Sequence, residues 1–237
     1  MIDAVALMET QVEVLFRLDA AGRLRHVNEP ELPEAPRFFL GRTRGGNVWR
    51  YRYDLPIELA RDLDRVVANE PVATGLDSGP PASADRVIAL LRMLAPVRDV
   101  WRGPAYAFPD TALTVRPMPA LAMAVTARNA ALLQGDFIRL RASLDAIQPC
   151  LAVVEDGMAV SVCHAVRRSG RAAEAGLATM EAYRGKGYAV AATAAWAAVV
   201  HGMGLRPLYS TSWDNKASQG VARRLGLVQY GEDWHVT

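Results

Sequence analysis

Cysteine is scarce in this sequence, which holds only Cys150 and Cys163 among its 237 residues. Two cysteines cannot build the disulfide framework that holds small secreted domains together. Both lie in apolar, strand-like runs, and free cysteines in such runs are usually buried. We therefore expect two inert, buried thiols in a protein of a reducing compartment.

Long apolar runs and clusters of basic residues are also missing. The longest uncharged apolar run, Tyr188 to Val200, is well short of the ~18 residues that span a bilayer. The start, Met1-Ile-Asp, lacks the basic residues of a signal peptide. A formal net charge of +2 with mixed signs does not indicate a nucleic-acid binder. These absences predict a cytoplasmic protein with no membrane partner and no nucleic-acid partner.

The N-terminal part of the chain predicts a mixture of strands and helices. Alternating hydropathy predicts one weak hairpin over residues 11–27 and a second over residues 37–53, around a Gly-Gly-Asn turn. Apolar residues at helical spacing predict helices over 56–69 and 84–94. Between residues 101 and 109 we expect an extended connection. The second hairpin carries four arginines that we interpret as a solvated face, namely Arg42, Arg44, Arg50 and Arg52.

The C-terminal part begins with helical spacing and then changes to strands. Residues 120–147 predict two helices with a break at Gly135. After Pro149 the expected order is β-β-β-α-β-α-β-β, an α/β arrangement with mixed strands. The expected strands are 150–154, 158–166, 173–180, 208–213, 227–230 and 234–236, and the expected helices are 188–200 and 216–225.

A glycine-bearing basic turn joins the third of these strands to the long helix. Arg184-Gly-Lys-Gly187 leads directly into the Ala-rich run that starts at Tyr188. The first N–H groups of a helix have no partner within the helix, and the helix dipole adds partial positive charge there. Glycines let a ligand approach the backbone closely. This stretch predicts an anion site.

Two common anion-binding loops do not fit this turn. A P-loop requires a further glycine upstream of its Gly-Lys pair and a hydroxyl residue directly after the lysine, but Lys186 is followed by Gly187. The dinucleotide fingerprint requires a small residue three positions after its second glycine, where this chain has Val190. What remains is the pattern Arg/Gln-x-x-Gly-x-Gly/Ala, which Arg184 to Ala189 satisfies.

These residues resemble the GNAT superfamily of acyl-CoA-dependent N-acetyltransferases. A second stretch, Trp213-Asp-Asn215-Lys-Ala-Ser218 before a helix ending at Leu225-Gly-Leu227, is similar to the family's second cofactor element. The order of elements is similar to the second half of the GNAT fold. The resemblance therefore covers roughly Ala120 to the C-terminus and implies a mixed, mostly antiparallel sheet flanked by helices.

The resemblance also implies which residues bind acetyl-CoA as the acyl donor. Backbone groups of the splayed strand would pair with the pantetheine arm, the turn would hold the pyrophosphate, and an asparagine would bind the pantetheine. The implied donor contacts are Leu177, Ala178, Thr179, Arg184, Gly185, Lys186, Gly187, Tyr188, Ala189 and Asn215.

One position departs from the family pattern. Many members carry a tyrosine seven residues after the asparagine, where its hydroxyl protonates the departing thiolate, and this chain has Ala222 there. The chain thus uses another acid, leaves protonation to solvent, or does not catalyse. Tyr209 and Tyr230 are near in sequence but do not occupy the motif position.

An amine acceptor must lose a proton when it attacks a thioester, and a carboxylate or a histidine usually takes that proton. Glu174, at the start of the third strand, resembles the family's general base, and a surface glutamate is the alternative. His164 has a suitable ordinary pKa, and a core histidine is the alternative. Glu174 and His164 are therefore the candidate catalytic residues.

Taken together, the sequence predicts two parts. Residues 1–110 form an α+β domain of unassigned role, for substrate binding or for formation of a homodimer. Residues 111–237 form a GNAT-like domain that transfers an acetyl group to the primary amine of a small molecule or peptide, by direct attack in a ternary complex. A non-catalytic module that binds acyl-CoA is the alternative, and an acyl group other than acetyl is also open.

Overall fold

The computed structural model describes residues 3–75, 79–109 and 121–237. The chain divides into two compact units that interleave in sequence. Unit 1 comprises Met1–Tyr106, Ser210–Asn215 and Gln229–Thr237, and unit 2 comprises Ala107–Tyr209 and Lys216–Val228. The boundary predicted between residues 110 and 111 lies outside the described residues and stays a prediction.

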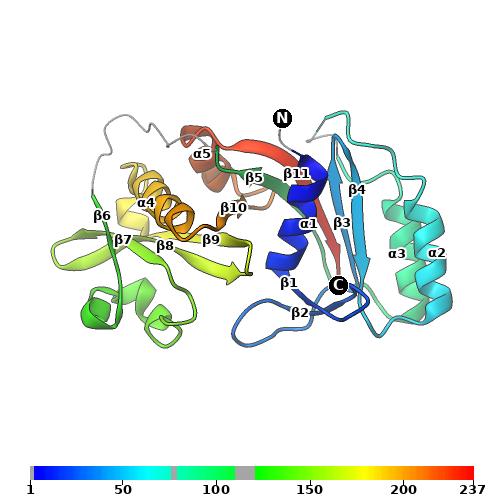
Figure 1. Ribbon diagram of the computed structural model, residues 1–237, viewed down its shortest axis with the longest axis horizontal. Coiled ribbons are helices and arrows are strands. Elements are labelled where there is room, and N and C mark those ends of the chain that lie inside the picture. Colours follow the sequence, from blue (N-terminus) through cyan, green and yellow to red (C-terminus); the bar gives the residue numbers. More distant parts are fainter. Residues whose placement is uncertain (1–2, 76–78, 110–120) are drawn as a thin grey trace. The chain divides into compact units, whose positions relative to one another are not determined.

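Unit 1 contains a sheet in the order β4-β3-β11-β5 and a separate ribbon of β1 and β2. Strands β3 and β4 form an antiparallel hairpin, and β11 pairs with β3 in antiparallel fashion. Figure 1 shows the elements in colours that follow the sequence. They are α1 (Ala4–Leu15), β1 (Phe16–Leu18), β2 (Leu24–Val27), β3 (Phe38–Thr43), β4 (Gly46–Tyr51), α2 (Ile57–Val67), α3 (Ala84–Leu94), β5 (Val100–Ala107) and β11 (Val228–Val236).

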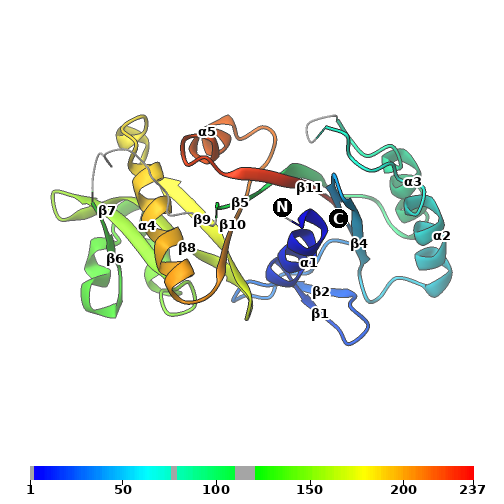
Figure 2. The ribbon, with the colours of Figure 1, turned by 45° about the horizontal axis from the view of Figure 1, so that its top comes forward.

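Helices cover both faces of the β3–β4 hairpin, and the two views of Figures 1 and 2 agree on this arrangement. Phe38 and Leu40 project toward α2 and α3 and form a core with Trp234 of β11. The opposite face lies under α1. A Cβ atom built on Gly41 would lie 2.4 Å from the side chain of the fully buried Met8, so glycine is required for α1 to pack this closely.

A buried ion cluster lies on the α2–α3 side of unit 1. The Arg42 guanidinium lies 3.6 Å from a Glu70 carboxylate oxygen and 3.4 Å from a Glu232 carboxylate oxygen. Glu232 also accepts a hydrogen bond from the Trp213 indole N–H at 2.9 Å. Burial raises the pKa of Glu232, and the nearby Arg102 opposes that rise. Removing one partner from such a cluster leaves a buried charge uncompensated.

Unit 2 contains a sheet in the order β10-β9-β8-β7-β6. Strands β6 to β9 are antiparallel to their neighbours, whereas β10 is parallel to β9. The elements are β6 (Ala122–Ala124), the 3₁₀ segments η1 (Ala127–Leu132) and η2 (Gly135–Arg141), β7 (Cys150–Glu155), β8 (Met158–Arg168), β9 (Ala172–Thr179), η3 (Glu181–Tyr183), α4 (Tyr188–Gly202), β10 (Arg206–Ser210) and α5 (Lys216–Arg224).

The two faces of the unit 2 sheet have different covers. On one face, the side chain of Cys163 lies near Thr193 of α4. On the other face, Cys150 and Val162 pack with the side chains of the η1–η2 segment, including Leu133 and Phe137. Side chains of a strand alternate between faces, so the α4 face also receives Leu177 of β9, and the η1–η2 face receives His164 and Glu174.

Most of the predicted elements are confirmed, including helices α2 and α3, strands β7 to β9 and helices α4 and α5. The mixed, mostly antiparallel α/β fold class is also confirmed. Both cysteines are free and buried as expected. Burial raises the pKa of the Cys150 thiol to about 12 and raises the pKa of Cys163 as well, so neither is an available thiolate near neutral pH.

Four predictions of secondary structure were wrong. Residues 11–15 belong to helix α1, whose Asp3 cap accepts the N–H of Ala6 at 3.0 Å. The extended connection over 101–109 is largely strand β5. The described part of 120–147 holds 3₁₀ segments in place of α-helices, because Asn129 has non-helical dihedrals and Gly135 has a φ of +52°. The two closing strands form one strand, β11.

The prediction of a solvated arginine face was also wrong for Arg42, which is buried between two glutamates. Its register partner on β11 is Glu232, far away in the sequence. Among the helices that the structure describes, none is both long enough and apolar enough to cross a membrane.

Candidate active site

Strand β9 loses one of its neighbours halfway along its length. Its parallel pairing with β10 covers the three register pairs from Arg206–Ala172 to Leu208–Glu174. Its antiparallel pairing with β8 continues to Ser161–Thr179. Burial follows this difference, because Ala172 to Ala175 are buried whereas Gly176 to Thr179 are partly or fully exposed. Within the described residues, the second half of β9 therefore presents an edge on the side of β10.

The backbone groups at that edge can be assigned from the hydrogen-bond alternation of antiparallel strands. The N–H of Met180 donates to the carbonyl of Val160 at 3.0 Å, so every second residue before Met180 also bonds to β8. Leu177 and Thr179 then direct their N–H and C=O groups away from β8. The Thr179 carbonyl agrees with this assignment, because it accepts a long hydrogen bond from Arg184 Nε at 3.4 Å.

The turn after β9 is built on two glycines in the left-handed region. Gly185 has a φ of +79° and Gly187 a φ of +84°, conformations that favour glycine. Gly187 is the N-cap of α4, and its carbonyl accepts the N–H of Ala191 at 3.1 Å. The N–H groups of Tyr188 to Val190 precede that first helical bond and have no intrahelical partner. The turn thus presents several N–H donors at the positive end of a helix dipole.

The charge around this turn is positive and exposed to solvent. Arg184, Gly185 and Lys186 are exposed, and the first turn of α4 contains no acidic residue. The Lys186 ammonium lies 4.7 Å from the centre of the Tyr183 ring. A Cβ atom on Gly185 would meet no atom of the described residues within 4 Å, so they leave space beside the turn. These features suit an anion of two or more charges.

Two tyrosines brace the start of α4. The rings of Tyr183 and Tyr188 lie 6.5 Å apart at an interplanar angle of 33°. The Tyr188 hydroxyl donates to a Glu155 carboxylate oxygen at the end of β7. That bond raises the pKa of Tyr188. Sequence reasoning placed Tyr188 at the donor site but missed Glu155, whose contact with the helix start depends on the strand order.

The stretch of chain that carries these features matches a known family. A family model described as Acetyltransferase (GNAT) domain matches residues 110–228, which is half of the chain. The chain belongs to the GNAT acetyltransferase family. The expected resemblance is therefore confirmed, including its place in the C-terminal part of the sequence. No curated protein matches the chain.

Solved GNAT structures resemble the chain in fold at low sequence identity. A GNAT-family acetyltransferase from Colwellia psychrerythraea is 13% identical, with 99% of this chain and 96% of that chain covered and a TM-score of 0.50. A GCN5-related N-acetyltransferase-like protein from Streptococcus suis is 18% identical, with coverages of 86% and 85% and a TM-score of 0.48.

A GNAT-family protein from Novosphingobium aromaticivorans is also 18% identical, with a TM-score of 0.43. This match covers 59% of the present chain, which spans 65% of the Novosphingobium chain. Identities this low carry information about fold and none about the acceptor.

The two candidate catalytic residues of the GNAT chain lie on one face of its sheet. His164 is the register partner of Gly176, and Glu174 lies two residues from Gly176 on the same strand. A Cβ atom on Gly176 would lie 2.9 Å from His164 Nε2, so the imidazole lies over this glycine. Glu174 is buried, and burial lowers the pKa of the partly buried His164. A histidine with a lowered pKa is neutral at pH 7 and able to accept a proton.

The second GNAT element lies in the turn before α5 and on that helix. Asn215 is exposed and its N–H donates to the Ser212 carbonyl at 3.1 Å. Asn215 belongs to unit 1, whereas the glycine turn belongs to unit 2. Ala222 of α5 is fully buried and offers only a methyl group. Position 222 therefore cannot supply the hydroxyl that a tyrosine would carry there.

A pair of hydroxyl groups lies one helical turn before Ala222. Ser218 precedes Ala222 by four residues, so both side chains lie on the same side of α5. The Tyr209 hydroxyl of β10 lies 2.5 Å from Ser218 Oγ. Sequence reasoning noted Tyr209 but did not connect it with Ser218, because the contact requires β10 and α5 to pack together.

Proposed function

We propose that the protein transfers an acetyl group from acetyl-CoA to a primary amine, by direct attack in a ternary complex. The observation that carries this proposal is the combination of the splayed second half of β9 with the glycine turn that follows it. One supplies backbone groups for an extended amide chain, and the other supplies N–H donors and positive charge for a pyrophosphate. The acceptor is a small molecule or a peptide with a free amine.

The acyl donor would be held by main-chain groups for most of its length. The outward N–H and C=O groups of Leu177 and Thr179 would bond the pantetheine amides, with Ala178 between them. The N–H groups from Gly185 to Ala189, together with Arg184 and Lys186, would bind the pyrophosphate. Asn215 is proposed as a further pantetheine contact, on the resemblance alone.

His164 is the proposed general base, and Glu174 is proposed as a base or as a residue that positions the acceptor amine. The amine nitrogen would attack the thioester carbonyl carbon and lose a proton, the C–S bond would break, and the departing thiolate would take up a proton. Neutral His164 can accept the amine proton directly or through one water molecule. Because Glu174 is buried, it can take either role only if the bound substrate reaches it.

The thiolate needs a proton donor because Ala222 has none. We propose the Ser218 hydroxyl, with Tyr209 behind it as the source of the proton. Ser218 lies one turn from Ala222 on the same side of α5, and its oxygen is within hydrogen-bonding distance of the Tyr209 oxygen. Ser218→Ala and Tyr209→Phe should each lower kcat by a larger factor than they change the KM for acetyl-CoA.

The test is release of free thiol from acetyl-CoA in the presence of a panel of amines, followed by mass spectrometry of the products. The proposal expects amine-dependent thiol release and a product heavier by one acetyl group. A protein that binds acetyl-CoA but releases no thiol with any amine would instead be the non-catalytic acyl-CoA-binding module, for which the buried Ala222 is the supporting observation. A protein that does not bind acetyl-CoA at all would refute both.

A further inference from the structure

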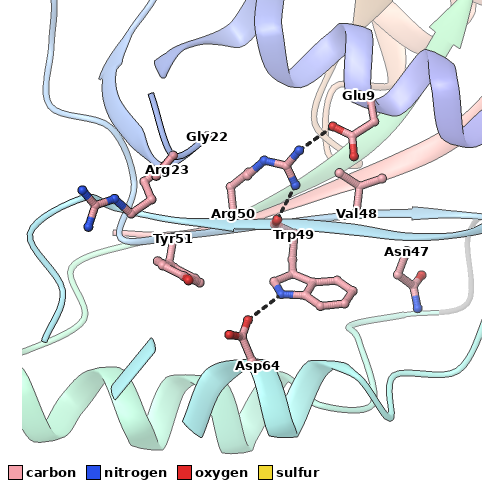
Figure 3. Close-up of a pocket in the computed structure, with 10 residues that line it drawn as sticks. Glu9, Gly22, Arg23, Asn47, Val48, Trp49, Arg50, Tyr51 and Asp64 are labelled. Carbon is pink, nitrogen blue, oxygen red and sulfur yellow. Dashed lines mark hydrogen bonds and ion pairs between the residues drawn. The ribbon is translucent and has the colours of Figure 1, made fainter. Parts of the chain in front are cut away.

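A cavity of about 410 Å³ lies along β4, the edge strand of the unit 1 sheet. Figure 3 shows the residues that line it. Five consecutive β4 residues, 47–51, contribute to the lining, together with Glu9 of α1, the β1–β2 turn and Asp64 of α2. Successive strand residues point to opposite faces of a sheet. A cavity over one face would touch every second residue, so this cavity follows the outer edge of β4.

The main chain of β4 presents hydrogen-bonding groups to this cavity. The Arg52 N–H donates at 2.9 Å to the carbonyl of Arg37, the residue just before β3. In an antiparallel ladder the main-chain groups of alternate residues point to the partner strand. The N–H and C=O groups of Val48 and Arg50 therefore point toward β3. The N–H groups of Asn47, Trp49 and Tyr51 point outward. The Trp49 carbonyl confirms this direction, because it accepts a hydrogen bond from Arg50 Nη1 at 2.7 Å.

Just beyond the cavity, a residue of β2 already pairs with the outer edge of the chain that continues β4. Leu24 of β2 forms a parallel bridge with Arg52, and its carbonyl accepts the Tyr53 N–H at 3.0 Å. Within the described residues, no strand takes the same position beside 47–51. The cavity therefore continues a strand-pairing edge over about 13 Å, at roughly 3.3 Å per residue.

Each charged side chain that lines the cavity already has a polar partner. Arg50 binds Glu9 at 2.6 Å on the α1 side, and the Trp49 indole N–H donates to Asp64 at 2.9 Å on the α2 side. Arg23 binds Asp19 at 2.7 Å. A ligand is thus selected by main-chain hydrogen bonds more than by charge, as in strand addition to a sheet edge.

The walls of the cavity decide between a peptide and a second copy of the chain. Residues of α1 and the β1–β2 turn form the wall on one side of β4, and α2 forms the wall on the other side. A second copy would bring its own β4 edge inside the same walls, and two recessed edges cannot meet without collision of the walls. A single extended segment has no such walls.

We propose that an extended, uncharged peptide segment of another protein binds as an added strand beside residues 47–51 of β4. Its alternate side chains face the Glu9–Arg50 pair on one side and the Trp49 and Tyr51 rings on the other. Small polar residues suit the first side and β-branched apolar residues the second. This interaction is independent of acetyl transfer.

The test uses the peptide acetyl-Thr-Val-Thr-Val-Thr-amide and amide hydrogen exchange of the protein. The peptide should slow exchange of the Asn47, Trp49 and Tyr51 amides at least tenfold in the wild type. The matched variants are Trp49→Val and Trp49→Pro, which both lose the indole, while only proline lacks the outward N–H. Trp49→Val should retain peptide binding, and Trp49→Pro should weaken it at least tenfold.

A second comparison needs no variant. The same peptide with N-methyl groups on its valine amides has a similar composition but cannot pair along that edge, and it should not slow exchange. Equal effects of the two peptides, equal binding by the valine and proline variants, or no slowing in the wild type would overturn the proposal. Self-association that Trp49→Pro abolishes would also overturn it, in favour of a second copy of the chain.

Discussion

The glycine turn offers the sharpest test of donor binding, through two substitutions at Gly185. Its φ of +79° is tolerated by asparagine and aspartate better than by other residues. A Cβ atom there meets no atom of the described residues within 4 Å, so either substitution has room at its Cβ. Gly185→Asn and Gly185→Asp have nearly the same shape and differ by one negative charge. The difference between them isolates the electrostatic contribution to pyrophosphate binding.

The size of that difference follows from Coulomb's law. An aspartate at position 185 would lie roughly 6 Å from a bound phosphate charge, which corresponds to about 0.7 kcal/mol in bulk water and about 3 kcal/mol at a surface-like dielectric of ~20. Because Arg184, Gly185 and Lys186 are exposed, we expect a value between these limits. The Kd of Gly185→Asp for acetyl-CoA should then exceed that of Gly185→Asn by about 3-fold to 150-fold.

Isothermal titration calorimetry at low and high salt measures this difference. The Kd ratio should shrink at high salt, because salt screens exposed charges. S-acetylpantetheine, which lacks the pyrophosphate, should bind both variants equally. If the two variants bind acetyl-CoA with the same Kd at low salt, the pyrophosphate does not lie at this turn and the reasoning is refuted.

Three further predictions concern the base, the buried ions and a tight backbone contact. Because burial lowers the pKa of His164, the kcat of the wild type should stay constant as the pH falls to 6.5 and should decrease only at lower pH, where His164 becomes protonated. His164→Gln should lower kcat by about 100-fold or more and should remove this decrease at low pH from the pH–rate profile. Arg42→Leu removes the guanidinium that lies between two buried glutamates and should lower the free energy of unfolding by about 3–5 kcal/mol in urea titrations, and an unchanged midpoint would contradict the pairing. Gly103→Ala should prevent folding of unit 1 as seen by circular dichroism, because its Cβ would lie 1.8 Å from the Thr211 carbonyl oxygen, whereas Gly170→Ala meets nothing within 4 Å and should fold normally.

The part of the molecule that we propose binds the donor was predictable because it is local in sequence. Strand β9, the glycine turn and the start of α4 are contiguous, and each follows from short-range rules on apolar runs, positive φ and helix starts. The turn type could be separated from two other anion loops by counting residues. The family followed from that turn together with the Asn215 stretch, and the family comparison agrees.

Errors arose where long-range packing overrides local pattern. Gly231-Glu-Asp233 has the composition of a turn, yet it continues β11 because β3 pairs with all three residues and Glu232 finds buried partners. Arg42 has the composition of a solvated strand face, yet the same pairing places it between two carboxylates. Arg42 and Glu232 are partners in the sheet but lie far apart in the sequence.

The α/β class, the glycine turn and the family could be predicted from the sequence alone, because these depend on residues that are neighbours along the chain. The fold was needed to show that His164 lies over Gly176 on the same face as Glu174 and that Ser218 lies against Tyr209. It also shows that none of the described strands pairs with the outer edge of β4 at residues 47–51. Each of these depends on which strands become neighbours in space. That choice is made by burial of the whole core, which no short stretch of sequence contains.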